Sequence, residues 1–163
     1  MMKIANSAFI DESAAIRGDV TLGEHVGVWC NAAVRGIGMK ITIGDCTNVQ
    51  DCVSIHGDIG SDVVIGKYVS VGHGAVVHGC TIDDNCIIGM NAVVLDNAHI
   101  GAGSIVGAGA VVPAGMIVPP NSLVIGMPAK VKKELPPEAL ASNIENAQEY
   151  MTFAKAQKAA QGK

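Results

Sequence analysis

An aliphatic residue returns every six positions through most of this chain, and this period decides what the chain can fold into. The longest run has eight members: Ile82, Ile88, Val94, Ile100, Val106, Val112, Val118 and Val124. Shorter runs precede it, over residues 10–34, 43–55 and 65–77, and a glycine often follows the aliphatic residue. The chain therefore contains an internal sequence repeat, and its fold has to consist of repeated structural units.

A period of six fits neither an α-helix, with a period of 3.6, nor one long β-strand, with a period of 2. It fits a short strand followed by a turn, with three such units making a triangular coil of 18 residues. A single coil cannot bury its apolar side chains alone, so stacked coils supply the core. We expect an all-β parallel β-helix over residues 1–130. A β-sandwich is the alternative for a chain rich in Gly and Val, but it would not keep this spacing over so many residues.

The remaining segment, residues 131–163, loses the period and has the pattern of a helix. Pro136 and Pro137 can open an α-helix because its first turn tolerates proline. An apolar stripe follows at Leu140, Ile144, Ala147, Met151 and Ala154. This spacing predicts an amphipathic helix that packs along the outside of the β-helix.

Composition excludes several classes of partner. The net charge is −4 and no basic run is present, which argues against nucleic acid. No stretch of about 18 apolar residues is present, so we expect no membrane span. The N-terminus lacks the apolar segment of a secretory signal. The five cysteines form no CxxC pair, which predicts reduced thiols, buried as small apolar residues, in a cytoplasmic protein.

The period slips at three places, all close to histidines. The step is three residues too long after Val34, four too long after Ile55 and one too short after Val77. Insertions in a solenoid form surface bulges, often on the binding face. We expect such bulges around residues 36–40 and 57–62.

When the insertions are subtracted, the polar residues fall into two columns. Arg35, His56 and His78 are then each one coil apart. Neighbouring strands lie about 4.8 Å apart, so the two imidazoles can converge on one point. Asp51 and His73 form a second column on another side of the triangle.

A metal ion with three histidine ligands requires each nitrogen within about 2.1 Å of it. The two columns are too far apart to meet in one chain, but His73 of a neighbouring subunit can reach His56 and His78. A contact of this head-to-tail kind closes into a ring, and a triangular rod suggests three subunits with three sites. His25 and His99 share neither column, and we interpret them as isolated, partly exposed side chains.

Several segments resemble the γ-class carbonic anhydrases and their close homologues. They are AAVRG (32–36), TNVQDCVSIH (47–56), VSVGHGAVVHGCTI (69–82), GMPAK (126–130) and NAQEY (146–150). The resemblance covers nearly the whole chain. It implies a left-handed β-helix with a C-terminal helix, assembled as a homotrimer.

The resemblance also implies a reaction. Zinc, or else iron or cobalt, would be bound by His56 and His78 of one subunit and by His73 of the next. The resulting metal hydroxide would attack CO2 and give bicarbonate.

Five further residues match polar positions of the family's site. Gln50 matches a residue that orients the water on the metal. Arg35 and Asp51 match an ion pair across the subunit interface, with Arg35 near the bicarbonate. Asn48 and Tyr150 match polar residues near the site.

Two departures from the family bear on the rate. Ile37 stands where the family usually has an aspartate, so one acidic partner of Arg35 is missing. The most active members carry a loop with glutamates that shuttle protons, whereas the acids of the bulges here are Asp58 and Asp62. We therefore expect the metal site to form and CO2 hydration at this site to be slow.

Two other functions stay open. Hexapeptide β-helices also serve as acyltransferases that use coenzyme A, or act on other thioesters, with one histidine as a general base. A lone base would not require three histidines in this arrangement. The second alternative is a metal-binding subunit of a larger assembly, without catalysis.

Overall fold

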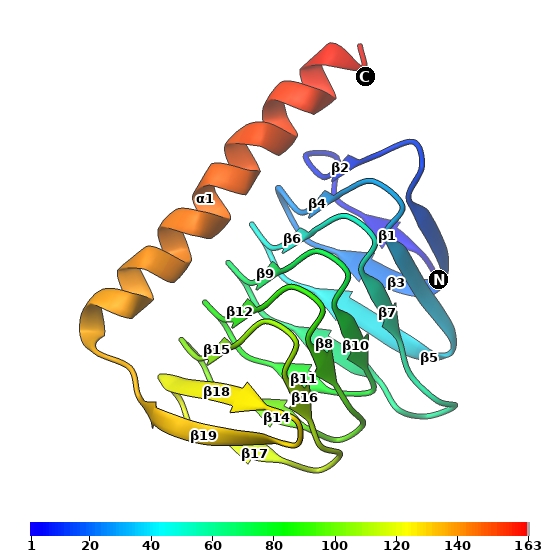
Figure 1. The fold of residues 1–163 in the computed structure, drawn as a ribbon. Helices are drawn as coiled ribbons and strands as arrows, with labels where there is room; N and C mark the ends of the chain where they lie inside the picture. Colours follow the sequence, from blue (N-terminus) through cyan, green and yellow to red (C-terminus); the bar gives the residue numbers. More distant parts are fainter. Residues whose placement is uncertain (163) are drawn as a thin grey trace.

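The structure, a computed structural model, describes residues 1–162. Short parallel strands wind through about seven turns of a left-handed β-helix, and one long helix lies alongside it (Figure 1). The predicted fold class is confirmed. Among the described residues, no helix is both long enough and apolar enough to cross a membrane.

One sheet of 11 strands covers two sides of the triangular rod. Its strands are β1 (Lys3–Ile4), β3 (Ala15–Leu22), β5 (Ala33–Ile43), β7 (Ser54–His56), β8 (Val63–Ile65), β10 (Val76–His78), β11 (Thr81–Ile82), β13 (Val93–Val94), β14 (His99–Ile100), β16 (Val111–Val112) and β17 (Ile117–Val118). The long strand β5 turns the corner, because its first half pairs with β7 and its second half with β8.

The third side is a sheet of eight strands. They are β2 (Phe9–Ile10), β4 (Gly27–Val28), β6 (Asn48–Val49), β9 (Ser70–Val71), β12 (Ile87–Ile88), β15 (Ile105–Val106), β18 (Ser122–Gly126) and β19 (Ala129–Glu134). The pairs are parallel except at the end, where β19 runs antiparallel to β18. This last strand forms the edge of the sheet, and its exposed charged side chains disfavour pairing with another chain.

The register of the coils follows the predicted period and its slips. Val94 pairs with Val112, one regular coil away, whereas Ile55 pairs with Val77 across the longer coil and Val77 with Val94 across the shorter one. The bulge predicted around residues 36–40 lies inside β5, where the pairing with β3 shifts register. The bulge predicted around residues 57–62 is a loop between β7 and β8.

Glycine is required where neighbouring coils nearly touch. Gly18 has φ of +85°, and a Cβ built on it would lie 2.0 Å from the carbonyl oxygen of Gly36. No L side chain fits such an approach. The register shift between β3 and β5 begins at this contact, so these two glycines allow the bulge that precedes the histidine column.

Helix α1 (Pro137–Ala160) begins at the predicted proline pair and packs on the eight-stranded sheet. Ala147 and Ala154 of the predicted stripe are buried. Asn143 is also buried, which its polarity did not suggest. Its Nδ2 donates to the carbonyl oxygens of Asn85, at 3.0 Å, and Gly103, at 3.2 Å. This amide ties the helix to the turns of two coils.

The predicted burial of the cysteines is wrong for two of them. Cys46, Cys80 and Cys86 are buried, but Cys30 is only partly buried and Cys52 is exposed. Cys52 has φ of +61°, so it occupies a left-handed turn at a corner of the rod. Cys46 has the same conformation, with φ of +60°, but is buried, so the turn alone does not decide exposure. All five thiols are free.

Candidate metal centre

His56 and His78 lie side by side at the ends of β7 and β10, in the predicted register. Their ring centres are 5.6 Å apart and the rings are nearly perpendicular, at 83°. Two imidazoles on one tetrahedral zinc, with Zn–N bonds of about 2.0–2.1 Å, have ring centres roughly 5 Å apart. The pair therefore fits two ligand positions of one ion with little rearrangement.

The Nδ1 atom of each ring already has a partner. His56 Nδ1 lies 2.7 Å from the carbonyl oxygen of Arg35, which can only accept a hydrogen bond. His78 Nδ1 lies 2.9 and 3.0 Å from the two carboxylate oxygens of Asp96. Both Nδ1 atoms thus carry the proton in the neutral rings, and Nε2 is left with a lone pair. This is the usual preparation of a metal-binding histidine.

Sequence reasoning missed Asp96. It approaches His78 because Gly79 has no side chain: a Cβ at Gly79 would lie 2.2 Å from Asp96 Oδ1. Gly79 also has φ of +50°, a conformation that favours glycine.

The second column is also present. His73 follows β9 on the eight-stranded sheet, and its Nδ1 lies 3.0 Å from Asp51 Oδ2. Its Nε2 lies 3.4 Å from the hydroxyl of Tyr150 on α1, a long hydrogen bond in which the phenol donates. Burial raises the pKa of Tyr150, so this hydroxyl keeps its proton at neutral pH.

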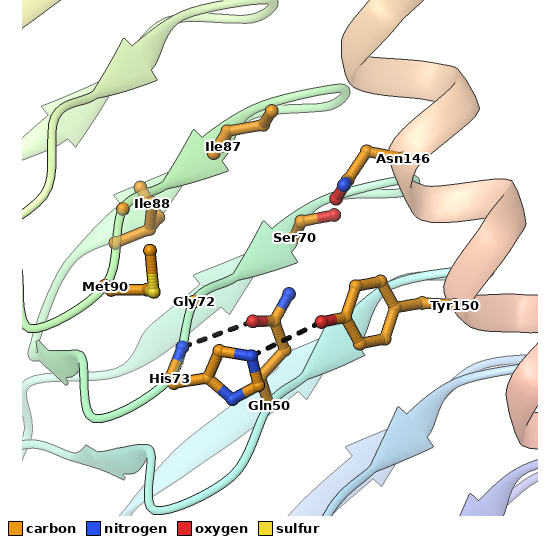
Figure 2. Close-up of a pocket in the computed structure, with 10 residues that line it drawn as sticks. Gln50, Ser70, Gly72, His73, Ile87, Ile88, Met90, Asn146 and Tyr150 are labelled. Carbon is orange, nitrogen blue, oxygen red and sulfur yellow. Dashed lines mark hydrogen bonds between the residues drawn. The ribbon is translucent and has the colours of Figure 1, made fainter.

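Gln50 belongs to a chain of buried amides beside His73. Its Oε1 accepts from the backbone N–H of His73 at 3.2 Å, and its Nε2 donates to Asn48 Oδ1 at 3.0 Å. The Nδ2 of Asn48 donates in turn to Ser70 Oγ at 2.8 Å. Figure 2 shows both hydrogen bonds of His73, from its backbone nitrogen to Gln50 and from its ring to Tyr150. The amide of Gln50 is thus held in one orientation.

A cavity of about 260 Å³ opens beside His73. Gln50, Ser70 and Tyr150 supply polar atoms, whereas one wall is apolar and consists of Ile87, Ile88 and Met90 (Figure 2). This size and lining suit a small, weakly polar molecule.

One chain does not bring the three histidines together. Within residues 1–162, no group of three possible metal ligands is assembled. His56 and His78 stand on one column and His73 on the other, where Asp51 bonds His73 and not Arg35. The predicted ion pair of Arg35 with Asp51 therefore also requires a second chain. His25 and His99 are partly exposed, as predicted, but His99 is not isolated, because its Nε2 lies 2.9 Å from Asp83 Oδ2.

Comparison with known proteins places the chain in a family. Residues 79–114 match the model of the bacterial transferase hexapeptide, with six repeats. A protein of Methanocaldococcus jannaschii named "probable carbonic anhydrase" is 47% identical over 152 residues, which cover 93% of this chain and 96% of that protein. The chain belongs to the γ-class carbonic anhydrase-like proteins of the hexapeptide-repeat family.

Solved structures of the hexapeptide-repeat family carry transferase names. A Bacillus cereus protein assigned as an acetyltransferase superposes with a TM-score of 0.94 and 38% identity, over 98% of this chain and 92% of its own. A hexapeptide transferase family protein of Anaplasma phagocytophilum has a TM-score of 0.91 and 34% identity, over 95% and 92%. The chain is therefore similar to proteins named for two different activities, by sequence to one and by structure to the other.

Proposed function

We propose that this chain forms a homotrimer that hydrates CO2 reversibly to bicarbonate, at a metal held by His56 and His78 of one subunit and His73 of the next. The observation that carries the proposal is the state of the rings. Each of the three Nδ1 atoms is bound to an oxygen, and His56 and His78 face the same point in register. Acyl transfer with one histidine as general base does not require this arrangement.

Zinc fits this all-imidazole donor set, as do iron and cobalt. A zinc ion with three neutral ligands supplies a nucleophile at neutral pH, because it lowers the pKa of bound water to about 7. Asp51 and Asp96 add two negative charges behind the ligands, which strengthens the hold of His73 and His78 on a cation.

Gln50 is placed to orient the attacking water. A glutamine amide offers two acceptor positions and two donors. His73 and Asn48 occupy one of each, so one lone pair and one N–H remain for the water. Because the amide is fixed at both ends, its direction is set before substrate arrives.

The apolar wall of the cavity suits CO2, and two groups suit the product. Arg35 is exposed on the same column as His56 and His78, and its positive charge attracts bicarbonate. The Tyr150 hydroxyl, protonated at neutral pH, can donate to an oxygen of the substrate once His73 Nε2 is engaged elsewhere.

Few side chains near His56 and His78 are suited to carry the released proton to solvent. The exposed side chains of the two bulges include the apolar Ile37 and Ile59, and Asp58 is an exposed acid among them. Asp62 accepts a hydrogen bond at 2.8 Å from the backbone of Lys40. Release of the proton to solvent then depends on the buffer, so we expect a hydration rate that rises with buffer concentration.

Acyl transfer from coenzyme A is the competing function, favoured by the names of the structural relatives. It requires one histidine as a base and no metal. Metal content separates the two functions independently of any assay of rate.

The experiment is stopped-flow CO2 hydration with metal analysis, on protein purified with and without oxygen. We expect about one metal per chain and measurable hydration, both lost in His73→Ala and both kept in the control His99→Ala. A protein that turns over acetyl-CoA and does so equally well as His73→Ala would refute the proposal. A trimer that binds metal but never hydrates CO2 would point to a non-catalytic subunit.

A further inference from the structure

A second pocket gathers most of the aromatic side chains of the protein. The sequence holds five Phe, Tyr and Trp residues in total, and four of them line this pocket: Phe9, Trp29, Tyr150 and Phe153. Successive ring centres are 5.1–5.9 Å apart. The pocket has a volume of about 470 Å³ and opens between the eight-stranded sheet and α1. So many aromatic faces around one opening require an explanation.

Two carboxylates line the same pocket. They are Asp11 and Asp51, and Cys30 lies on the coil between them. The hydrogen bond and the charge of Asp11 raise the pKa of the Cys30 thiol, and Asp51 raises it to a smaller extent. Hydrogen bonds from Ser13 lower the pKa of Asp11, so this carboxylate is ionised at neutral pH. No lysine or arginine of the described chain lines the pocket. His73 also lines the pocket and pairs with Asp51, so among the described residues Asp11 is the lining carboxylate without a cationic partner. Aromatic faces and this carboxylate together suit a cation.

The column of Arg35, His56 and His78 carries a second arginine, Arg17, at its start. Arg17 lies directly opposite Arg35 in the register of β3 and β5, and both side chains are exposed. Like charges opposite each other on neighbouring strands are destabilising. A pair of this kind is explained if each guanidinium has an acidic partner outside its own chain.

We propose that Arg17 of one subunit inserts its guanidinium into the aromatic and acidic pocket of the next subunit. The inference rests on the proposed trimer. In a ring, coils at the same level face each other around the axis. Arg17 lies one coil before Arg35, and Cys30 lies one coil before Asp51. If Arg35 faces Asp51 of the neighbouring subunit, Arg17 therefore faces Cys30 of that subunit, which lies between its Asp11 and Asp51.

The chemistry selects arginine over lysine. A guanidinium stacks its flat face on aromatic rings and binds a carboxylate through two parallel N–H donors, whereas an ammonium does neither. Arg17→Lys should therefore weaken the trimer nearly as much as Arg17→Ala. The contact also explains why Trp29 and Phe153 remain partly open in the single chain.

The test measures assembly and the fluorescence of Trp29, the only tryptophan. Sedimentation equilibrium gives the dissociation constant of the trimer for wild type, Arg17→Ala, Arg17→Lys, Asp11→Asn and the double variant Arg17→Ala/Asp11→Asn. Lys132→Ala is the control, a lysine on the exposed strand β19. We expect both Arg17 variants to raise the constant roughly ten-fold or more, with a shift in Trp29 emission, and the control to match wild type.

The double variant decides whether the two residues are partners. If they contact each other, Arg17→Ala/Asp11→Asn dissociates no more readily than Arg17→Ala alone. Effects that add in full, or Arg17 variants that assemble like wild type, would overturn the inference. Methylguanidinium that binds to the intact trimer and shifts Trp29 emission would also overturn it, because the pocket would then be open.

Zinc content, measured on the same samples, separates this inference from the proposed function. A zinc-loaded trimer that is indifferent to Arg17 refutes the inference and leaves the metal centre standing. A wild-type chain that stays monomeric and binds no zinc refutes both.

Discussion

The contact between Asp96 and His78 gives the sharpest prediction for the metal centre. Both carboxylate oxygens lie within 3.0 Å of His78 Nδ1, so this ring is held and polarised by a full negative charge. Asp96→Asn keeps the size of the side chain and one acceptor oxygen. The ring should stay in place and keep its tautomer, while the charge behind it is lost.

The magnitude follows from the kind of hydrogen bond. A bond to a charged group contributes about 1.5–3 kcal/mol, against about 0.5–1.5 kcal/mol for a neutral one. The change to asparagine should therefore cost about 1–2 kcal/mol of zinc binding. Since 1.4 kcal/mol corresponds to a factor of ten, zinc affinity should fall roughly 5- to 30-fold. This range overlaps the lower part of the 10- to 100-fold loss that is typical of outer partners of metal ligands.

The assay is a competition titration of metal-free protein against a chromophoric chelator. The control is Asp83→Asn, because Asp83 makes the same type of contact, at 2.9 Å, with His99 on β14, another side of the rod. We expect weaker zinc binding in the Asp96 variant only. Equal affinity of wild type and Asp96→Asn, or equal losses in both variants, would refute the reasoning.

Three further predictions concern the scaffold. Ile65→Ala should lower the free energy of unfolding by about 2–5 kcal/mol in a urea titration, because Ile65 is 1% exposed, whereas Ile59→Ala, at 90% exposure, should change it by less than about 0.5 kcal/mol. Gly18→Ala should unfold at far lower urea than Gly109→Ala: both positions have positive φ, but only the first Cβ would collide with backbone. Burial raises the pKa of Cys80 to about 12, so the folded chain keeps a proton that the unfolded thiol loses near pH 9. The free energy of unfolding should then fall as pH rises from about 9 to about 12, less steeply in Cys80→Ala.

The coils could be predicted from the sequence because each hexapeptide places one aliphatic side chain in the core. Counting residues is then equivalent to measuring position along the rod. The same counting predicts that His56 lies beside His78 and Asp51 beside His73, and the structure shows both. It could also have found Arg17, which stands one regular coil before Arg35.

Contacts that depend on side-chain direction could not be counted. The coil after Val77 is one residue short, so Asp96 lies one position beyond the residue opposite His78. Its side chain reaches His78 because Gly79 has no side chain in the way. Cys52 has an apolar side chain at a corner that faces outward. Asn143 is buried because its amide satisfies two turn carbonyls, which no hydrophobic pattern reveals.

The central claim is that each metal centre is built by two subunits, and mixing of subunits tests it most directly. His73→Ala keeps the first column and loses the second, whereas His78→Ala keeps only the second. Neither variant alone should bind zinc firmly. If equal amounts are unfolded together and refolded, every mixed ring contains one intact site, so random mixing restores about one quarter of the wild-type zinc content. Zinc in either variant alone, or none in the mixture, would contradict the account.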